Sequence, residues 1–254
     1  MNEPIINNKI KLYNYVFYTL IILLLIFAVI KLSHYNKNLN KKIDDLQRII
    51  NEHDKQIQTL SSLRIQKFNT TFVAFKRYNK TIDTAIVSQF LKTTKVFKLD
   101  TSNYMYELMI SQICYETGAK HLLDNKIITG GHGEKGISQI LPRTAFYTLK
   151  NLTKSEKDIM LNKLCCSDFD FVYSDDYNKS KNKMIAWLSN LINNLALWGH
   201  IMNSYICETG NYLKALHIYN VGHGNHMAFI RARLNLKSHT YISNILKIRS
   251  KNFK

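Results

Sequence analysis

Residues 127–145 read IITGGHGEKGISQILPRTA, and four glycines fall within seven of these residues, at positions 130, 131, 133 and 136. Glycine adopts backbone conformations that other residues avoid, so a run this rich in glycine can approach a ligand closely. All nine glycines of the 254-residue chain lie between Gly118 and Gly224. Tight turns are therefore expected in the C-terminal half, and helix with simple connections over the first 117 residues.

Helices are expected on both sides of this glycine segment, residues 127–145. Residues 102–116 fit one helix, and Thr117-Gly118 after it is typical of a helix C-cap. Glu116 then stands at a helix end that faces the glycine segment. Further helices are expected over 82–93, over 183–206, from Tyr212 to the end, and after a capping box of Thr153 and Glu156. The pattern predicts a mostly α-helical domain over residues 81–254.

Four stretches of this domain resemble, in the same order, the motifs of the soluble lytic transglycosylase family. Glu116-Thr117 is compared with E-S, and residues 133–145, GEKGISQILPRTA, with G-A-x-G-L-M-Q-I-M-P-x-T-A. Asn194-Leu195 with Gly199 is compared with N-x-x-x-G, and residues 215–222, ALHIYNVG, with A-L-x-x-Y-N-x-G. Each match alone is weak, but the four in sequence, over residues 80–235, make the resemblance strong.

The resemblance implies a lysozyme-like helical fold and an enzyme that cleaves the glycan strands of peptidoglycan between N-acetylmuramic acid and N-acetylglucosamine. In that family a single glutamate acts first as acid and then as base, and the residue that matches it is Glu116. The residues at the family's substrate-binding positions are Thr117, Gly136, Ser138, Gln139, Tyr219 and Asn220. Of these, Gly136 and Gln139 are expected to shape the glycan groove.

Three residues depart from the family pattern. Thr117 replaces the usual Ser, Ser138 the usual Met, and Glu134 a small residue. The stretch over residues 146–184 is also longer than the family norm. An added loop or helix is therefore expected beside the groove.

The chemistry of glycosidic cleavage agrees with an acidic role for Glu116. Such an acid must stay protonated until it donates to the leaving oxygen, so an apolar pocket should raise its pKa. Tyr219 is an expected neighbour that helps to hold Glu116. Under the resemblance, the N-acetyl group of the substrate stabilises the oxocarbenium-like centre, and the muramyl 6-hydroxyl closes a 1,6-anhydro ring without water.

A second carboxylate would change this outcome. Most glycosidases use one as nucleophile or as the base that activates water. Asp124 and Glu134 are the candidates, and either of them, if it points into the groove, makes a hydrolytic muramidase the alternative. No metal and no cofactor are expected, because His223 and His226 have no acidic or cysteine partner in a recognised pattern.

A transmembrane anchor is predicted over residues 13–30, which read YNYVFYTLIILLLIFAVI. A short N-terminal flank, residues 1–12, precedes it. The run can cross most of a bilayer and has no polar face. A buried core helix and a cleaved signal peptide are the alternatives, although no A-x-A-like cleavage site follows the run. Lysines are more numerous after it, which by the positive-inside rule favours a cytoplasmic domain. Peptidoglycan lies outside the bacterial cytoplasmic membrane, so the resemblance overrides this count and places residues 31–254 outside.

Residues 35–67 predict a coiled-coil stalk after the anchor. Apolar residues and one histidine recur at alternating spacings of four and three, at Leu39, Ile43, Leu46, Ile50, His53, Ile57 and Leu60. This seam indicates a parallel homodimer, and His53 within it either weakens the stalk or sets its register. The alternative is a surface helix that lies back on the domain. Residues 68–80 are expected to form a connection.

Composition limits the class of protein and its partners. Hydrophobic residues make up 46% of the chain, which excludes wholesale disorder. Lys and Arg exceed Asp and Glu by 35 − 18 = 17, which indicates a polyanionic partner. Without an RNA-binding motif or a basic helix, an anionic cell wall is favoured and no nucleic acid is expected. The four cysteines are expected to be structural or free thiols: Cys114, Cys165, Cys166 and Cys207.

Two functions of different classes remain open at this point. The preferred one is a membrane-anchored peptidoglycan lytic transglycosylase. Its rival is a noncatalytic envelope scaffold, whose lysozyme-like domain only binds glycan. Glu116 favours the enzyme, because it is retained beside Gly136, Gln139 and Tyr219-Asn220. Wall turnover, a secretion or conjugation apparatus, and phage entry or exit are all compatible with the sequence.

Overall fold

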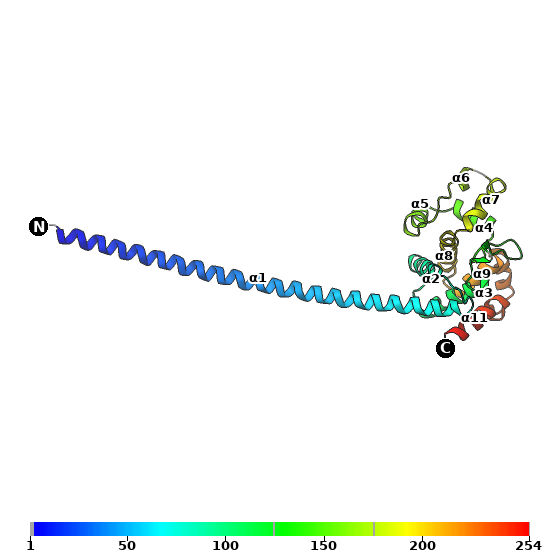
Figure 1. The fold of residues 1–254 in the computed structure, drawn as a ribbon, viewed down its shortest axis with the longest axis horizontal. Helices are drawn as coiled ribbons and strands as arrows, with labels where there is room; N and C mark the ends of the chain where they lie inside the picture. The colour runs from blue at the N-terminus through cyan, green and yellow to red at the C-terminus, as the bar shows by residue number, and fades with distance from the viewer. Residues whose placement is uncertain (1–2, 124, 175, 254) are drawn as a thin grey trace. The chain divides into compact units, whose positions relative to one another are not determined.

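The computed structural model describes residues 3–123, 125–174 and 176–253, with side chains described from Thr19 onward. Helices make up 75% of the chain, which confirms the mostly helical class (Figure 1). The chain divides into two compact units, Met1–Arg64 and Ile65–Lys254. The first unit consists of the greater part of α1 (Glu3–Lys76), and the second holds all the later elements.

The later elements are short helices with one small sheet. In chain order they are α2 (Thr84–Val96), α3 (Asn103–Thr117), β1 (Leu122–Leu123), β2 (Lys126–Ile127), α4 (Pro142–Lys150), α5 (Lys154–Asp158), the π-helix η1 (Ile159–Lys163), α6 (Phe171–Ser174), α7 (Tyr177–Leu188), α8 (Leu191–Thr209), α9 (Tyr212–Val221), α10 (His223–Arg231), the 3₁₀ helix η2 (Leu236–Ser238) and α11 (Thr240–Asn252).

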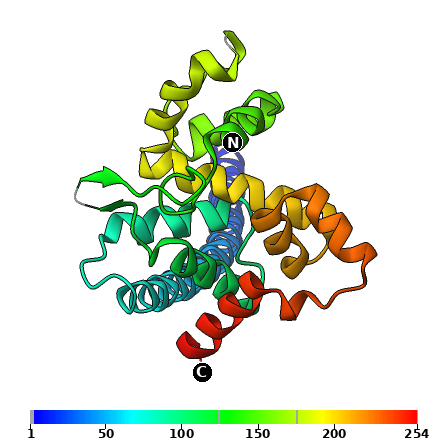
Figure 2. The same ribbon diagram turned by 90° about the vertical axis from the view of Figure 1, so that its right-hand side faces the viewer.

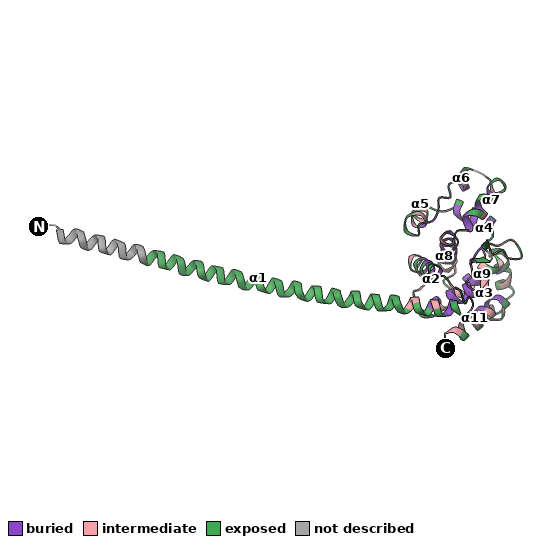
Figure 3. Ribbon diagram, viewed as in Figure 1, coloured by how far each residue is buried: buried purple, intermediate pink, exposed green. Residues whose placement is uncertain are grey.

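Helix α1 carries the expected anchor and the expected stalk without interruption. Its apolar stretch, described from Thr19, is long and apolar enough to cross a membrane, and none of it is buried (Figure 3). The buried core helix that was one alternative for this run therefore does not form. A helix of this kind near an N-terminus serves as a membrane anchor or as a signal sequence. The seam side chains from Leu39 to Leu60 are exposed as well.

The segment expected as a connection, residues 68–80, is instead helical as far as Lys76. Thr71, Ala74 and Phe75 are buried, and Phe75 meets Phe90 of α2 edge-on with ring centroids 5.3 Å apart. Because one face of this segment packs against the core, the helix continues where a loop was expected. The compact second unit accordingly starts at Ile65 rather than at residue 81.

Polar side chains fix the ends of α2 and α3. The Asp83 carboxylate accepts a hydrogen bond from the Ala85 N–H at 2.8 Å, so α2 begins at Thr84. The Ser102 hydroxyl accepts from the Met105 N–H at 3.2 Å, and Gly118 ends α3 in the left-handed conformation, with φ of 65°. This C-cap is confirmed, as is the capping box of Thr153 and Glu156 at the start of α5.

The single long helix expected over residues 183–206 is wrong. It is divided into α7 and α8 at Ser189 and Asn190. The Asn190 side chain accepts hydrogen bonds from the backbone N–H groups of Ile192 and Asn193, at 2.8 and 3.3 Å. An asparagine that satisfies the free N–H groups of a new first turn favours a helix start over helix continuation.

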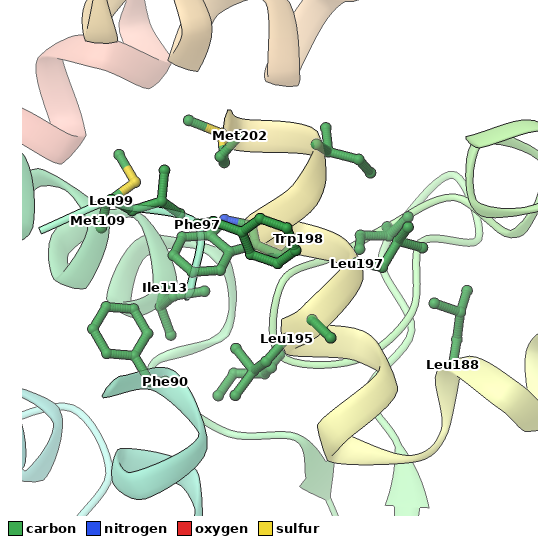
Figure 4. Packing of buried hydrophobic residues seen from close by; sticks show 14 of the residues in the cluster. Phe90, Phe97, Leu99, Met109, Ile113, Leu188, Leu195, Leu197, Trp198 and Met202 are labelled. Carbon is green, nitrogen blue, oxygen red and sulfur yellow. The ribbon is translucent and has the colours of Figure 1, made fainter. Parts of the chain in front are cut away.

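The core of the second unit is built around α8. Figure 4 shows Trp198 and Leu195 of this helix among side chains of α2, α3 and the chain between them. Gly199 lets α2 approach, because a Cβ there would lie 2.3 Å from Thr93 Cγ2 and 2.7 Å from Phe97 Cδ2. Helix α8 is thereby fixed beside α2 and α3, and it presents its last turns to the candidate site.

The glycine segment follows a short antiparallel hairpin, in which Leu122 pairs with Ile127 and Leu123 with Lys126 (Figure 2). The segment then folds back on itself. The Gly130 N–H donates to the Glu134 carbonyl at 2.9 Å, and the Gly136 N–H donates to the Ile128 carbonyl at the same distance. These turns bring residues 130–141 next to the C-terminal end of α3.

Candidate functional site

A groove of about 280 Å³ lies where the end of α3, the glycine segment, α4, α8 and α9 meet. Most of its polar lining comes from the glycine segment and from the ends of α3 and α9. Its lining residues are Glu116, Gly130, Gly131, Glu134, Gln139, Ile140, Leu141, Thr144, Ile201, Tyr205, Tyr219 and Asn220.

Glu116 lies in the last turn of α3, two residues before the Gly118 cap, and is half-buried. Burial raises the pKa of Glu116 to about 7, although the hydrogen bond from Tyr241 acts in the opposite direction. The negative charge of Glu134 also raises this pKa, because a second carboxylate disfavours the ionised form of the first. Glu116 is therefore partly protonated near neutral pH, as a general acid must be.

A buried chain of hydrogen bonds holds the Glu116 carboxyl from behind. The Trp198 indole N–H donates to Gln112 Oε1 at 3.1 Å, and Gln112 Nε2 donates to the Tyr241 hydroxyl at 3.2 Å. The Tyr241 hydroxyl in turn donates to Glu116 Oε1. Gln112, Trp198 and Tyr241 are all buried, so this arrangement fixes the orientation of the carboxyl without reaching the groove surface.

Four of the residues expected at the site line the groove together: Glu116, Gln139, Tyr219 and Asn220. Gln139 Nε2 donates to the Gly136 carbonyl at 2.7 Å. The Tyr219 hydroxyl donates to the Ser138 carbonyl at 2.6 Å. Tyr219, which was expected to help hold Glu116, thus holds the glycine segment, and the hydroxyl that donates to Glu116 is that of Tyr241.

The other three expected residues do not line the groove. Thr117 donates to the Ile137 carbonyl at 3.1 Å, and Ser138 is buried and donates to Asn194 Oδ1 at 2.6 Å. Gly136 has φ of 73°, and a Cβ there would lie 2.4 Å from Asn194 Nδ2. These three residues support the glycine segment from within and are not among the residues that line the groove.

Asn194 is the centre of this support. Besides accepting from Ser138, it donates to the Lys135 and Leu188 carbonyls at 3.0 and 3.3 Å. Four residues separate it from Gly199, one more than the N-x-x-x-G pattern has. The third motif is therefore matched only loosely, although the buried asparagine contacts the second motif.

Glu134 is the second carboxylate among the lining residues that the structure describes. Its Oε2 accepts a hydrogen bond from the His132 N–H at 3.0 Å. A Cβ on Gly130 would lie 2.4 Å from both Glu134 Oε2 and Gln139 Oε1, so the absence of a side chain lets these two oxygens pack closely against the Gly130 backbone. The other sequence candidate for a second acid, Asp124, lies outside the described residues.

The apolar part of the groove lining comes from α8 and from the glycine segment. Ile201 and Tyr205 lie one turn apart on that helix, and Leu141 of the glycine segment adds exposed apolar surface. Burial raises the pKa of Tyr205, so its ring is neutral at ordinary pH. An aromatic ring with a polar tip suits contact with the apolar face of a sugar ring.

Sequence patterns did not indicate Tyr241, Gln112, Trp198 or Tyr205. Gln112 and Trp198 fall among apolar helix residues and resemble ordinary core positions. Tyr241 is 125 residues from Glu116, in a helix that carries no motif used for the resemblance. The only local signal is the apolar face of α11, with Tyr241, Ile242 and Ile245 buried.

The remaining chemically active side chains lie outside the groove lining. His226 is buried against His217, with their Nδ1 atoms 2.9 Å apart, and His223 pairs with Glu208 at 2.6 Å. Among the side chains that the structure describes, at residues 19–123, 125–174 and 176–253, no group of three or more His, Cys, Asp or Glu is placed to hold a metal ion. All four cysteines are free thiols, with Cys114 and Cys166 buried.

The added segment expected beside the groove, residues 146–184, contains the end of α4, α5, η1, α6 and most of α7. None of the lining residues described above comes from it.

Comparisons with family models, with curated proteins and with solved structures gave no match to this chain.

Proposed function

We propose that this chain is a membrane-anchored enzyme with a lysozyme-like domain that cleaves peptidoglycan glycan strands, at the β-1,4 bond between N-acetylmuramic acid and N-acetylglucosamine. The observation that carries the proposal is Glu116. It is a half-buried carboxyl with its pKa raised to about 7, and it lies in a groove beside Gln139, Tyr219 and Asn220. These are the motif residues that the resemblance to lytic transglycosylases assigns to the site.

In the proposed reaction, Glu116 donates its proton to the glycosidic oxygen as the bond to the muramyl anomeric carbon breaks. The N-acetyl group of the substrate stabilises the positive charge at that carbon. Glu116 then takes the proton of the muramyl 6-hydroxyl, which closes the 1,6-anhydro ring. The hydroxyl already belongs to the bound sugar and needs only orientation, which favours it over a free water. Tyr241 holds Glu116 through both steps.

A second candidate is hydrolysis at the same bond, as in a muramidase. The observation that favours it is Glu134, which lines the groove together with Glu116. Glycosidases with two carboxylates use the second one to activate water or as a nucleophile. Both candidates require the same acid, so they share the test that follows.

The test replaces Glu116 by Gln, which keeps size and hydrogen bonding but removes the proton donor. Cleavage of purified cell wall by Glu116→Gln is expected to fall by at least about a hundredfold, since a positioned acid contributes about 10²–10⁴-fold. Glycan binding and the melting temperature are expected to stay near those of the parent. If the parent binds glycan but neither protein releases fragments, the noncatalytic scaffold is the correct function.

We place the enzyme in the bacterial cytoplasmic membrane, with one pass through α1 and residues 31–254 on the outer side. The long apolar stretch of α1 supports the anchor, and the location of the substrate supports the orientation. Protease added to intact spheroplasts is expected to digest the C-terminal domain. Protection of that domain until the membrane is permeabilised would show that the positive-inside rule holds here and that the orientation is reversed.

A further inference from the structure

Three histidines pack against one another in the C-terminal part of the chain, and none of them lines the groove. His217 lies in α9, His226 in α10, and His239 directly before the first residue of α11. The Nδ1 atoms of His217 and His226 are 2.9 Å apart, and the His239 ring meets the His217 ring edge-on with centroids 4.4 Å apart. The Phe229 ring lies 4.5 Å from that of His217, centroid to centroid. His217, His226 and His239 are called the imidazole cluster below.

The hydrogen bond between His217 and His226 is compatible with a neutral pair of rings only. One Nδ1 must donate and the other accept, so a single hydrogen lies between them. Both rings are buried, and His217 Nε2 has no hydrogen-bond partner among the described residues. In any positively charged form of the pair, either two N–H groups face each other or His217 carries a buried N–H on Nε2 without an acceptor. The neutral pair in which His217 donates avoids both costs.

The groups around the imidazole cluster also disfavour a positive charge. Burial lowers the pKa of His226 most, and His223 of α10 and Lys214 of α9 lower it further. The one acid that acts on His226 in the opposite direction is Glu208 of α8. Its carboxylate is already paired with His223 at 2.6 Å. A proton on the cluster therefore meets more repulsion than attraction.

The imidazole cluster joins elements that hold groove residues in place. Tyr219, which holds the glycine segment, follows His217 by two residues on α9. Tyr241, which donates to Glu116, follows His239 by two residues in the first turn of α11. Separation of the rings would move α9 and α11 close to these two tyrosines.

We propose that the imidazole cluster is an acid-sensitive switch. While its rings are neutral, it holds α9, α10 and the start of α11 together, and a proton taken up from solvent by the His217–His226 pair breaks their hydrogen bond and separates these elements. Tyr219 and Tyr241 are then held less firmly, so the groove loses its shape in acid. No step depends on glycan cleavage, and the switch is tested separately from the proposed function.

The pH range of the switch follows from the change in environment of the buried ring. Burial, and then the charges of the other two rings, lower the pKa of His217 from 6.5 to about 4. A released ring lies in water and regains its ordinary pKa, so the released state binds the proton at a pH where the packed state does not. The packed state is therefore fully stable above about pH 6.5 and is weakened as the pH falls toward about 4.

Hydrogen exchange measures the release directly. The full-length chain in detergent micelles is labelled with deuterium between pH 7 and pH 4, and the rates are corrected for the intrinsic pH dependence of amide exchange. Protection of residues 212–245 is expected to fall below about pH 6.5, by up to about tenfold per pH unit for each imidazole that takes up a proton. Helix α2 carries none of the cluster and is the internal reference, whose protection is expected to fall much less.

His226→Asn is the main variant. Its amide can donate to His217 Nδ1 from nearly the place of the original Nδ1, but it cannot be protonated. The loss of protection between pH 6.5 and pH 4 is therefore expected to be about tenfold smaller than in the parent, or less still. His132→Asn removes an exposed histidine of the same unit and is the matched control, with the parental profile expected.

His239→Asn carries the test if His226→Asn does not fold. His239 is the N-cap of α11, and asparagine is favoured at that position. The variant removes one of the charges that hold the pKa of His217 down, so it is also expected to reduce the loss of protection in acid.

The outcomes are as follows. A loss of protection confined to residues 212–245 in the parent, and reduced in His226→Asn or His239→Asn, supports the switch. Equal protection at pH 7 and pH 4 in the parent overturns it, and so does an equal loss in α2, because the chain then unfolds as a whole. Folded His226→Asn and His239→Asn proteins that lose protection as the parent does, or a His132→Asn protein that loses as little as they do, also overturn it.

Discussion

At the residue scale, the protonation of Glu116 is decided by neighbours that act in opposite directions. Burial favours the neutral acid, and so does the charge of Glu134. The Tyr241 hydroxyl favours the carboxylate, because it donates a hydrogen bond that stabilises the negative charge. The balance leaves the pKa at about 7, so the same side chain can give up a proton and take one back.

Glycan cleavage is accordingly expected to fall as pH rises through about 7, because the acid form of Glu116 is lost there. Tyr241→Phe removes a donor to the carboxylate, so it should raise the pKa of Glu116 and move this alkaline limb to higher pH. The rate at the optimum should also fall, because the carboxyl is held less firmly. The measurement is the initial rate of muropeptide release across pH for the parent and the variant.

The matched control is Tyr147→Phe, which removes the hydroxyl of an exposed tyrosine outside the groove lining and should leave the pH limb in place. Tyr241→Phe also leaves the Gln112 amide without its acceptor, at a cost of about 1–3 kcal/mol in stability. A limb that stays fixed, or moves to lower pH, in folded Tyr241→Phe contradicts the positioning role.

At the element scale, the glycine segment is shaped by the buried side chains that pack against Gly136. Gly136 is left-handed, and Asn194 and His121 stand where its side chain would be, with His121 Cε1 2.9 Å from an ideal Cβ. His121 also accepts from the Ile137 N–H at 3.2 Å through Nδ1. Burial lowers the pKa of His121, so it stays neutral and can serve as this acceptor. The segment is thereby held rigid where it carries Glu134 and Gln139 to the groove.

Gly136→Ala should therefore destabilise the second unit by about 2–4 kcal/mol, through backbone strain and displacement of Asn194. Gly131→Ala is the matched control: it has no atom within 4 Å of an added Cβ and should change stability by less than about 0.5 kcal/mol. Both tryptophans, Trp187 and Trp198, lie in this unit, so thermal unfolding followed by their fluorescence reports on it. Equal melting temperatures for the two variants would contradict the packing argument.

At the scale of the whole molecule, α1 joins a stretch suited to a membrane with a stretch suited to a second helix. In the seam, isoleucine occupies the a positions at 43, 50 and 57, and leucine the d positions at 39, 46 and 60. Isoleucine at a with leucine at d favours a parallel pair of helices. A parallel pair also agrees with two copies anchored in one membrane. We therefore retain the homodimer as a proposal.

Ile50→Cys should cross-link two copies on mild oxidation, because an a position faces its counterpart across a parallel seam. Lys55→Cys, on the opposite face of the same helix, is the matched control and should give only the background due to the exposed Cys165 and Cys207. The measurement is the dimer fraction on a nonreducing gel. Equal dimer fractions for the two variants would remove the coiled coil and favour a monomeric helix.

The sequence alone was sufficient for features that depend on neighbours within a few residues. The helical class, the C-cap of α3, the position of Glu116 before Gly118 and the apolar stretch of α1 all follow from local hydrogen bonding and periodicity. The division between α7 and α8 was missed because a polar cap at Asn190 competes with a helical pattern that continues across it.

Only the tertiary structure decided which side chains face the groove. Motif spacing put Thr117, Ser138 and Gln139 in one set, but the turn at Gly136 directs Ser138 inward to Asn194 and leaves Gln139 at the groove. The tertiary structure also brings Tyr241 to Glu116 across 125 residues and places Glu134 in the same groove. The physical reason is that orientation at a turn and contacts between distant helices are set by close packing of the core, which no local pattern encodes.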